Sequence, residues 1–161
     1  MAINHEFDYH GYLIQNVFQA IPDDVGAEII DLWLRNRAVA GRQVAEQRVN
    51  QVVLTIRNPE KRLVGVSTVY IGDFLRPGQR YYFYRMFIQP GDRRPGLMRC
   101  VSLRTRDLLK QQNPPDGPKG LIIVTENQKL MRPGMKRMFE RNGYEYLGRG
   151  PRGNDLWRYQ F

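Results

Sequence analysis

The 161 residues, 42% hydrophobic and 25% charged, fit a single domain over 1–161 and exclude a chain that is disordered throughout. The single cysteine excludes an internal disulfide. No apolar run approaches the ~20 residues that cross a bilayer, and the N-terminus lacks the basic and apolar regions of a secretory signal. We therefore expect a cytoplasmic protein without membrane contact. The net charge of +9 is uneven, because residues 1–79 carry 8 basic and 9 acidic residues whereas residues 80–161 carry 17 and 7, which predicts an anionic partner for the second half.

The first part of the chain is predicted to hold a strand and a helix. Residues 7–18 are rich in aromatic and branched side chains, which is typical of a strand. Residues 21–24, an Ile-Pro-Asp-Asp turn, offer an N-cap for a helix whose apolar positions recur at helical spacing over 25–36. Residues 38–47 fit either the end of a helix or a loop.

Three neighbouring antiparallel strands are expected next. Residues 51–56 and 63–71 flank a polar turn centred on proline, and a second turn at 76–79 leads into a strand over 81–88. Neither of the chain's two histidines has an acidic or thiol neighbour at ligand spacing, so we expect no metal site.

Helix and strand alternate over the remaining residues. The expected elements are a helix after residue 96, a breaker-rich loop at 113–118, a strand at 121–125, a helix that begins near Pro133 and ends at 142–143, and closing strands at 144–147 and 156–161. Residues 80–125 are therefore expected to form a strand, helix, strand crossover, which is right-handed in nearly all proteins.

The stretch 87–109 combines a strand end, a basic loop with glycine and a helix start, and this construction binds phosphate. The first N–H groups of a helix have no partner within it, and the macrodipole places partial positive charge there. Gly96 lets the backbone approach a ligand, and Arg93, Arg94 and Arg99 add charge at the same end. A phosphate-bearing ligand is therefore predicted at this loop, while basic residues elsewhere fit a solvated surface equally well.

The spacing within this loop resembles the acyl-CoA pyrophosphate loop of the GNAT superfamily of N-acetyltransferases. The pattern h-x-P-x-x-R-x-x-G-h is formed by Ile88, Pro90, Arg93, Gly96 and Leu97. The family's core pattern is Q/R-x-x-G-x-G/A, and Met98 stands where the family has its last small residue. The segment RMFERNGY, residues 137–144, is similar to the family's closing helix and its Y-E-K-x-G-F signature.

The resemblance implies a fold, a donor and a donor site. The expected fold is α/β: a central mixed, mostly antiparallel sheet with helices on both faces, whose two central strands splay apart to form an acyl-CoA cleft. The donor would be acetyl-CoA, with its pantetheine bonded to the backbone of Phe87 and Ile88. The residues expected to hold its pyrophosphate are Arg93, Arg94, Pro95, Gly96, Leu97 and Met98. Homodimers formed through exposed sheet edges are common in the family.

Transfer of an acyl group to an amine requires a base for the amine and donors for the developing oxyanion. Glu126 follows the buried strand beside the expected cleft and is the best-placed general base, with Asn127 to orient a carbonyl or a water. The family's tyrosine acid aligns with Phe139, which has no proton to give. Tyr82, Tyr84 and Tyr144 are the remaining candidate acids. The structural alternatives are a solvated strand end for the glutamate and packed rings for the tyrosines.

Two functions from different classes follow. The first is an acyl-CoA-dependent N-acyltransferase, specifically an N-acetyltransferase, which acts directly on the amine of an unidentified anionic or nucleic-acid-linked acceptor. The alternative is a GNAT-like binding module without catalysis, which contacts nucleic acid through the Arg-rich C-terminal half and stacks bases on Tyr146 and Trp157. Binding of CoA would support the first, and salt-dependent affinity for nucleic acid the second.

Overall fold

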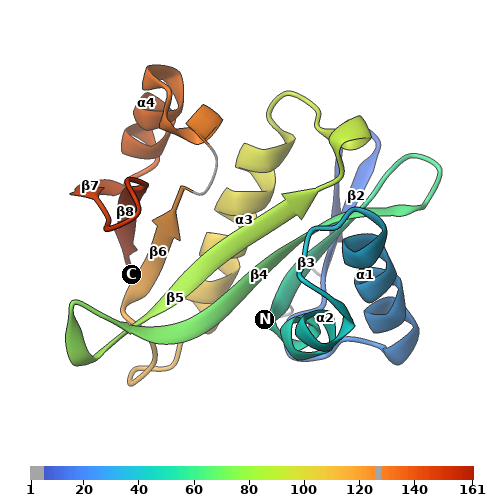
Figure 1. Ribbon diagram of the computed structural model, residues 1–161, viewed down its shortest axis with the longest axis horizontal. Coiled ribbons are helices and arrows are strands. Elements are labelled where there is room, and N and C mark those ends of the chain that lie inside the picture. The colour runs from blue at the N-terminus through green and yellow to red at the C-terminus, as the bar shows by residue number, and fades with distance from the viewer. Residues whose placement is uncertain (1–5, 126–127) are drawn as a thin grey trace. The chain divides into compact units, whose positions relative to one another are not determined.

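The computed structural model describes residues 6–125 and 128–161 (Figure 1). Within these residues, eight strands form one sheet in the order β1-β2-β3-β4-β5-β6-β8-β7. The strands are β1 (Glu6–Tyr9), β2 (Tyr12–Asn16), β3 (Val52–Arg57), β4 (Leu63–Phe74), β5 (Arg76–Ile88), β6 (Gly120–Val124), β7 (Glu145–Arg149) and β8 (Asp155–Gln160). The helices are α1 (Asp23–Arg35), α2 (Arg42–Arg48), α3 (Leu97–Gln112) and α4 (Pro133–Arg141), with short 3-10 turns η1 (Val49–Gln51), η2 (Pro90–Asp92) and η3 (Gln128–Met131).

The strand pairing is mostly antiparallel. The pairs β1–β2, β2–β3, β3–β4, β6–β8 and β7–β8 all run antiparallel. β5 runs parallel to β6, with Tyr82, Phe83 and Tyr84 opposite Leu121, Ile122 and Ile123. α3 joins these two strands, as a parallel pair requires a crossover connection. The expected α/β fold with a mixed, mostly antiparallel sheet is therefore confirmed.

The chain divides into two compact units. The first unit comprises the described residues up to Val69 together with Arg85–Leu108, and the second comprises Tyr70–Tyr84 with the described part of Leu109–Phe161. The long strands β4 and β5 each contribute residues to both units. The expectation of one domain over 1–161 stays a prediction.

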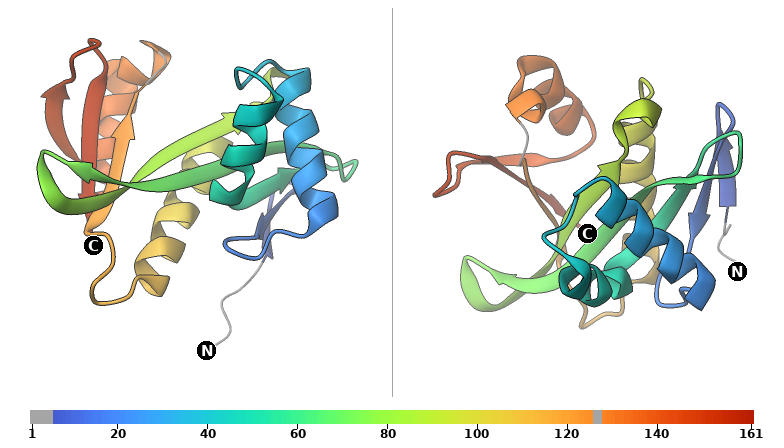
Figure 2. Two further views of the ribbon diagram at one scale, coloured as in Figure 1. Left: turned by 60° about the horizontal axis from the view of Figure 1, so that its bottom comes forward. Right: turned by 45° about the vertical axis from the view of Figure 1, so that its right-hand side comes forward.

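The core of the first unit lies between α1, α2 and one face of β3 and β4. It consists of Ile29, Leu32, Trp33, Ala45, Val52, Leu63 and Val66. Successive residues of a strand point to opposite faces, so Ser67 lies on the face opposite to Val66. There its hydroxyl lies 2.8 Å from that of Thr105 on α3. Helices therefore cover both faces of this part of the sheet (Figure 2).

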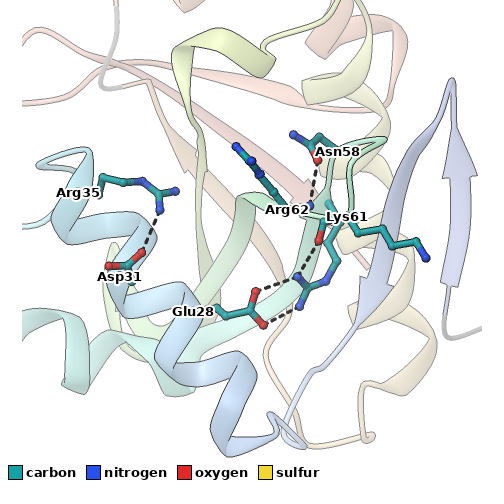
Figure 3. Close-up of polar contacts among 7 residues, drawn as sticks. Glu28, Asp31, Arg35, Asn58, Lys61 and Arg62 are labelled. Atoms are coloured by element: carbon teal, nitrogen blue, oxygen red, sulfur yellow. Dashed lines mark hydrogen bonds and ion pairs between the residues drawn. The ribbon is translucent and has the colours of Figure 1, made fainter.

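A polar contact joins α1 to β3 at the surface of the first unit. Both carboxylate oxygens of Glu28 accept hydrogen bonds from the Arg57 guanidinium, at 2.9 and 3.0 Å (Figure 3). These hydrogen bonds, with the charge of Arg57, lower the pKa of Glu28. One turn further along α1, Asp31 pairs with Arg35 at 2.9 Å, but both side chains are exposed and the pair contributes little stability. The Glu28–Arg57 pair is therefore the stronger of these two surface contacts.

The second unit is built around aromatic rings. Phe139 of α4 stacks on Trp157 of β8 with ring centroids 5.0 Å apart, and Tyr144 meets Phe139 edge-on at 5.6 Å. Tyr70 of β4 stacks on Phe83 of β5 at 5.1 Å. Trp157 has no exposed surface, so α4 covers the face of β8 that carries it. Ring packing thus attaches the amphipathic helix to the sheet.

Two local predictions are wrong. Residues 7–18 form a hairpin rather than one strand, because His10 and Gly11 have φ values of 48° and 88° and turn the chain between β1 and β2. The turn expected at 76–79 lies instead at Leu75, with a φ of 68°, and its proline and glycine belong to β5. The stretch after α1 that fits either helix or loop contains α2.

Candidate functional site

The loop between β5 and α3 lies wholly in the first unit. β5 ends at Ile88, η2 follows, and the exposed residues 93–96 lead into α3 at Leu97. Leu97 has no exposed surface and anchors the start of the helix, while Met98 is half-buried. The structure thus brings the residues expected to hold pyrophosphate together at the N-terminus of one helix.

This loop presents positive charge and unpaired backbone donors. The side chains of Arg93, Arg94 and Arg99 are exposed, and none of them forms an ion pair with the described residues. In the part of the chain that the structure describes, the N–H groups of Met98 and Arg99 have no acceptor, as expected in the first turn of a helix. Together with the helix dipole, these groups suit an anion.

Gly96 is required by the loop itself. Its φ of 79° lies in the left-handed region, which residues with a side chain rarely adopt. A Cβ at this position would also collide with the hydroxyl of Tyr9. That hydroxyl donates a hydrogen bond to the carbonyl of Pro95 at 3.1 Å. The sequence predicts that a glycine here admits a ligand. The positive φ and the Tyr9 hydroxyl require a glycine at this position even in the absence of a ligand.

Asp92 places a carboxylate within this basic loop, and its side chain is engaged by neighbours. The residue is only 8% exposed. Its Oδ1 accepts a hydrogen bond from the Tyr12 hydroxyl at 2.9 Å, and its Oδ2 accepts one from Nε2 of Gln89 at 2.6 Å. Burial, with the hydrogen bond to Asp92, raises the pKa of Tyr12, so the phenol keeps its proton and donates it. The negative charge is therefore held inside the loop.

The end of β5 directs its backbone groups to alternate sides. The carbonyl of Phe87 faces β4, where a Cβ on Gly65 would lie 2.8 Å from it. Backbone groups of successive strand residues point to opposite sides, so those of Ile88 point away from β4. The Ile88 carbonyl accepts a hydrogen bond from Nε of Arg93 at 2.8 Å. Of the two expected pantetheine positions, Ile88 is the one whose backbone groups face away from β4.

The expected catalytic residues are not part of this loop. Glu126 and Asn127 lie outside the described residues. Tyr84 in β5 and Tyr144 just before β7 are both buried and belong to the second unit. Burial also raises the pKa of Tyr82, on the same face of β5 as Tyr84. The catalytic roles of these residues stay predictions.

Phe139, which the sequence predicts to align with the family's tyrosine acid, has aromatic surroundings. Its side chain is 5% exposed and lies between the rings of Trp157 and Tyr144. The indole N–H of Trp157 is buried and has no hydrogen-bond partner among the described residues. A ring that packs flat on Trp157 explains the phenylalanine as a core residue of the second unit.

The expectation that Trp157 stacks nucleic-acid bases is wrong. Trp157 has no exposed surface, because Phe139 and Tyr146 pack on it. Tyr146 is 41% exposed, but the centroid of its ring lies 5.0 Å from the Trp157 centroid and 5.2 Å from the Lys136 ammonium. Arg158 is held by both carboxylate oxygens of Glu145. The aromatic platform that the binding-module alternative requires is therefore absent at Trp157.

Across 6–125 and 128–161, the side chains of His, Cys, Asp and Glu do not gather in groups of three that could hold a metal ion. Over the same ranges, no helix combines the length and the apolar character needed to cross a membrane.

Three residues of the loop's surroundings are missed by sequence reasoning: Tyr9, Tyr12 and Asp92. A signal for the hairpin is present, because a His-Gly pair stands between alternating aromatic and branched residues. No sequence pattern, however, pairs a tyrosine near the N-terminus with an aspartate eighty positions later. These contacts are tertiary, because β3 and β4 separate the hairpin from β5 within the sheet and the two tyrosine side chains still reach the loop.

Neither a family model nor a curated protein matches this sequence. Solved structures do match. A GNAT-family acetyltransferase from Listeria monocytogenes is 15% identical with a TM-score of 0.61, over 97% of this chain and 99% of that one. A GCN5-related N-acetyltransferase from Kribbella flavida is 10% identical with a TM-score of 0.64, over 94% and 98%. A chain of the NatC complex, crystallised bound to Gag peptide and CoA, is 10% identical with a TM-score of 0.63, over 93% and 98%. The chain therefore has the fold of the GNAT acetyltransferases.

Proposed function

We propose that this chain is an acyl-CoA-dependent N-acetyltransferase that transfers an acetyl group directly from acetyl-CoA to an amine. The observation that carries the proposal is the loop between β5 and α3. It combines exposed Arg93, Arg94 and Arg99 with the unpaired N–H groups of Met98 and Arg99, in a chain with the GNAT fold. A fold hosts many functions, so the proposal depends on this site as well as on the likeness.

The residues of the loop fit the pyrophosphate of the donor. Two adjacent phosphates need several donors and compensating positive charge, which the helix N-terminus and the arginines supply. The loop's own carboxylate, Asp92, forms no ion pair with these arginines among the described residues, and its two oxygens accept hydrogen bonds from Tyr12 and Gln89 instead. Met98 has a flexible thioether side chain in place of the family's small residue, and it can move aside for a ligand.

The backbone of Ile88 would bond the pantetheine amides. Its carbonyl already accepts a hydrogen bond from Arg93, at 2.8 Å. A carbonyl oxygen has two lone pairs, so a pantetheine N–H can join this contact or replace it. If the pantetheine N–H displaces the Arg93 side chain from this carbonyl, the guanidinium becomes available to the phosphates. One side chain would then respond to both parts of the donor.

When bound, acetyl-CoA supplies the acetyl group as an activated thioester. The chain must remove a proton from the acceptor ammonium, so that the amine can form the C–N bond as the C–S bond breaks. Glu126 is the proposed base, and Asn127 would orient the reacting groups. Phe139 cannot protonate the leaving thiolate, but thiols are far more acidic than alcohols, so a thiolate leaves without full protonation. Tyr84 and Tyr144 are the proposed donors where protonation assists.

The acceptor would be an amine carried by an anionic molecule. The excess positive charge of residues 80–161, 17 basic against 7 acidic, favours such a molecule electrostatically. Exposed arginines of the second unit also have no ion-pair partner among the described residues. They include Arg132, Arg137, Arg141 and Arg152.

Calorimetric titration with CoA tests the donor site. Arg99→Glu is the informative variant, because the side chain is exposed at the first turn of α3 and its replacement leaves the packing unchanged. Gly96→Glu would be ambiguous, since it also disturbs the contact with Tyr9. We expect saturable binding by the native protein and a dissociation constant at least about tenfold higher for Arg99→Glu, from the loss of a charge-assisted hydrogen bond.

The control is Arg62→Glu, which reverses another exposed charge in the β3–β4 turn of the same unit (Figure 3). Its affinity for CoA should match that of the native protein. Equal weakening by both variants would mean that only net charge matters. Absence of CoA binding, together with salt-dependent binding of nucleic acid, would replace the enzyme proposal with the binding module.

A further inference from the structure

The N-terminal hairpin, residues 6–16, lies along the loop and the first turns of α3. The Tyr9 hydroxyl donates to the Pro95 carbonyl at 3.1 Å, and the Tyr12 hydroxyl reaches the loop's buried carboxylate at 2.9 Å. Further along α3, the guanidinium of Arg104 lies 3.9 Å from the centroid of the Phe7 ring. All these residues belong to the first unit. The hairpin therefore holds the loop from one side.

The Tyr9 contact orients one peptide group of the loop. The peptide between Pro95 and Gly96 is trans, so its carbonyl and its N–H point in opposite directions. Because the carbonyl points to Tyr9, the N–H of Gly96 points away from the hairpin. Gly96 is exposed, and this N–H has no acceptor in the described part of the chain. Tyr9 thus directs a further unpaired donor to solvent, next in sequence to the first turn of α3.

The hairpin also removes an obstacle to an anion. Tyr12 and Gln89 together engage both oxygens of Asp92, which is 8% exposed. Without these contacts the carboxylate could rotate toward the exposed arginines and neutralise them. The two tyrosines therefore have complementary effects, since one directs a donor outward and the other retains a negative charge inside.

We propose that Tyr9 is a positioning residue of the donor site, which sets the Pro95–Gly96 peptide so that the Gly96 N–H faces a phosphate of the ligand. This inference rests on the proposed function, because the orientation matters only if a phosphate binds at the loop. When the hydroxyl is absent, the peptide is free to rotate and the donor is lost to the ligand for part of the time. The consequence is weaker binding of acetyl-CoA, with the chemical step unaffected.

Tyr9→Phe tests the inference, because it removes the hydroxyl alone. The dissociation constant for CoA and the KM for acetyl-CoA should rise about three- to tenfold, while kcat stays within about twofold of the native value. Tyr146→Phe is the matched control: it removes a hydroxyl bonded at 2.9 Å to Asp155 in the second unit, and its affinity for CoA should stay native. A purely structural role for Tyr9 would lower stability without this split between KM and kcat.

The outcomes separate this inference from the proposed function. If the native protein binds CoA and Tyr9→Phe binds it equally well, the inference is wrong and the donor site stands. If the native protein binds no CoA, both fail. A second test needs no ligand: Gly96→Ala should shift the urea midpoint less in the Tyr9→Phe background than in the native one, because the colliding hydroxyl is gone. Equal shifts in both backgrounds would refute the geometry on which the inference is built.

Discussion

A buried chain of hydrogen bonds attaches α3 to the sheet, and Thr105→Val tests how much it contributes. The Leu54 N–H donates to the Ser67 hydroxyl at 3.1 Å, and the Ser67 and Thr105 hydroxyls lie 2.8 Å apart. Thr105 gives its own proton to the Val101 carbonyl at 2.8 Å, so Ser67 must be the donor to Thr105. Ser67 and Thr105 have no exposed surface.

Valine at position 105 keeps the shape of threonine and leaves the Ser67 hydroxyl with no acceptor. An orphaned buried hydroxyl costs about 1–3 kcal/mol, so the free energy of unfolding should fall by that amount. Thr105→Ser keeps the hydroxyl and removes one methyl group, which costs about 1 kcal/mol from lost apolar burial. The serine variant should therefore be more stable than the valine variant by up to about 2 kcal/mol, which is the cost of the orphaned hydroxyl minus that of the lost methyl group.

Urea denaturation followed by circular dichroism measures these differences. Ser102→Ala on the same helix is the control, because its hydroxyl is bonded only to the Arg99 carbonyl of its own helix at 3.1 Å, and its loss should change stability by less than about 0.5 kcal/mol. A Thr105→Val variant as stable as the native protein would refute the reasoning. The donor direction assigned to Ser67 would then be wrong, or another acceptor would be within its reach.

Three further predictions concern packing, pH and backbone geometry. Phe139→Ala should lower the free energy of unfolding by about 3–5 kcal/mol, measured by urea denaturation, since the ring is buried against two others. Glu28 has a lowered pKa in the folded state, so its contribution is present above its unfolded pKa of about 4.3 and is lost as pH falls through the folded value. Glu28→Gln should accordingly destabilise by less than about 1 kcal/mol at neutral pH, and this difference should disappear once the pH lies below the folded pKa of Glu28. A constant difference at all pH values would contradict the ion pair with Arg57. Gly120→Ala should lower the free energy of unfolding by at least about 3 kcal/mol, because a Cβ there would overlap the backbone of β8. A Cβ at Gly91 would meet no described residue other than its chain neighbours within 4 Å, so Gly91→Ala should leave the melting temperature unchanged.

Much of the fold follows from the sequence, because its signals are local. The apolar run at 121–125 and the helical spacing after residue 96 predict β6 and α3 correctly. The hairpin is missed because its signal is a single His-Gly pair, and the residues on both sides of that pair are equally aromatic and branched. The β4–β5 turn is displaced because Leu75, and not the Pro-Gly pair that follows, adopts the positive φ.

The candidate site could be predicted only in part. The loop between β5 and α3 is contiguous in sequence, so its residues and their charge can be identified without a structure. The neighbour of Gly96 cannot be predicted from the sequence, because Tyr9 belongs to a strand far away in the chain. The burial of Trp157 is likewise a tertiary effect of Phe139 and Tyr146, and an aromatic residue among arginines has the same local pattern whether it is buried or exposed.

The central claim is tested most directly by measuring the products of the reaction. The purified protein is incubated with acetyl-CoA and a panel of amines that includes amines on anionic molecules, and both the free thiol and the acetylated amine are quantified. The account predicts equal amounts of thiol and acetylated amine for at least one acceptor, with the rate at low acetyl-CoA reduced by Arg99→Glu and unchanged by Arg62→Glu. Thiol release no faster than spontaneous hydrolysis with every acceptor, from a protein that also fails to bind CoA, would contradict it.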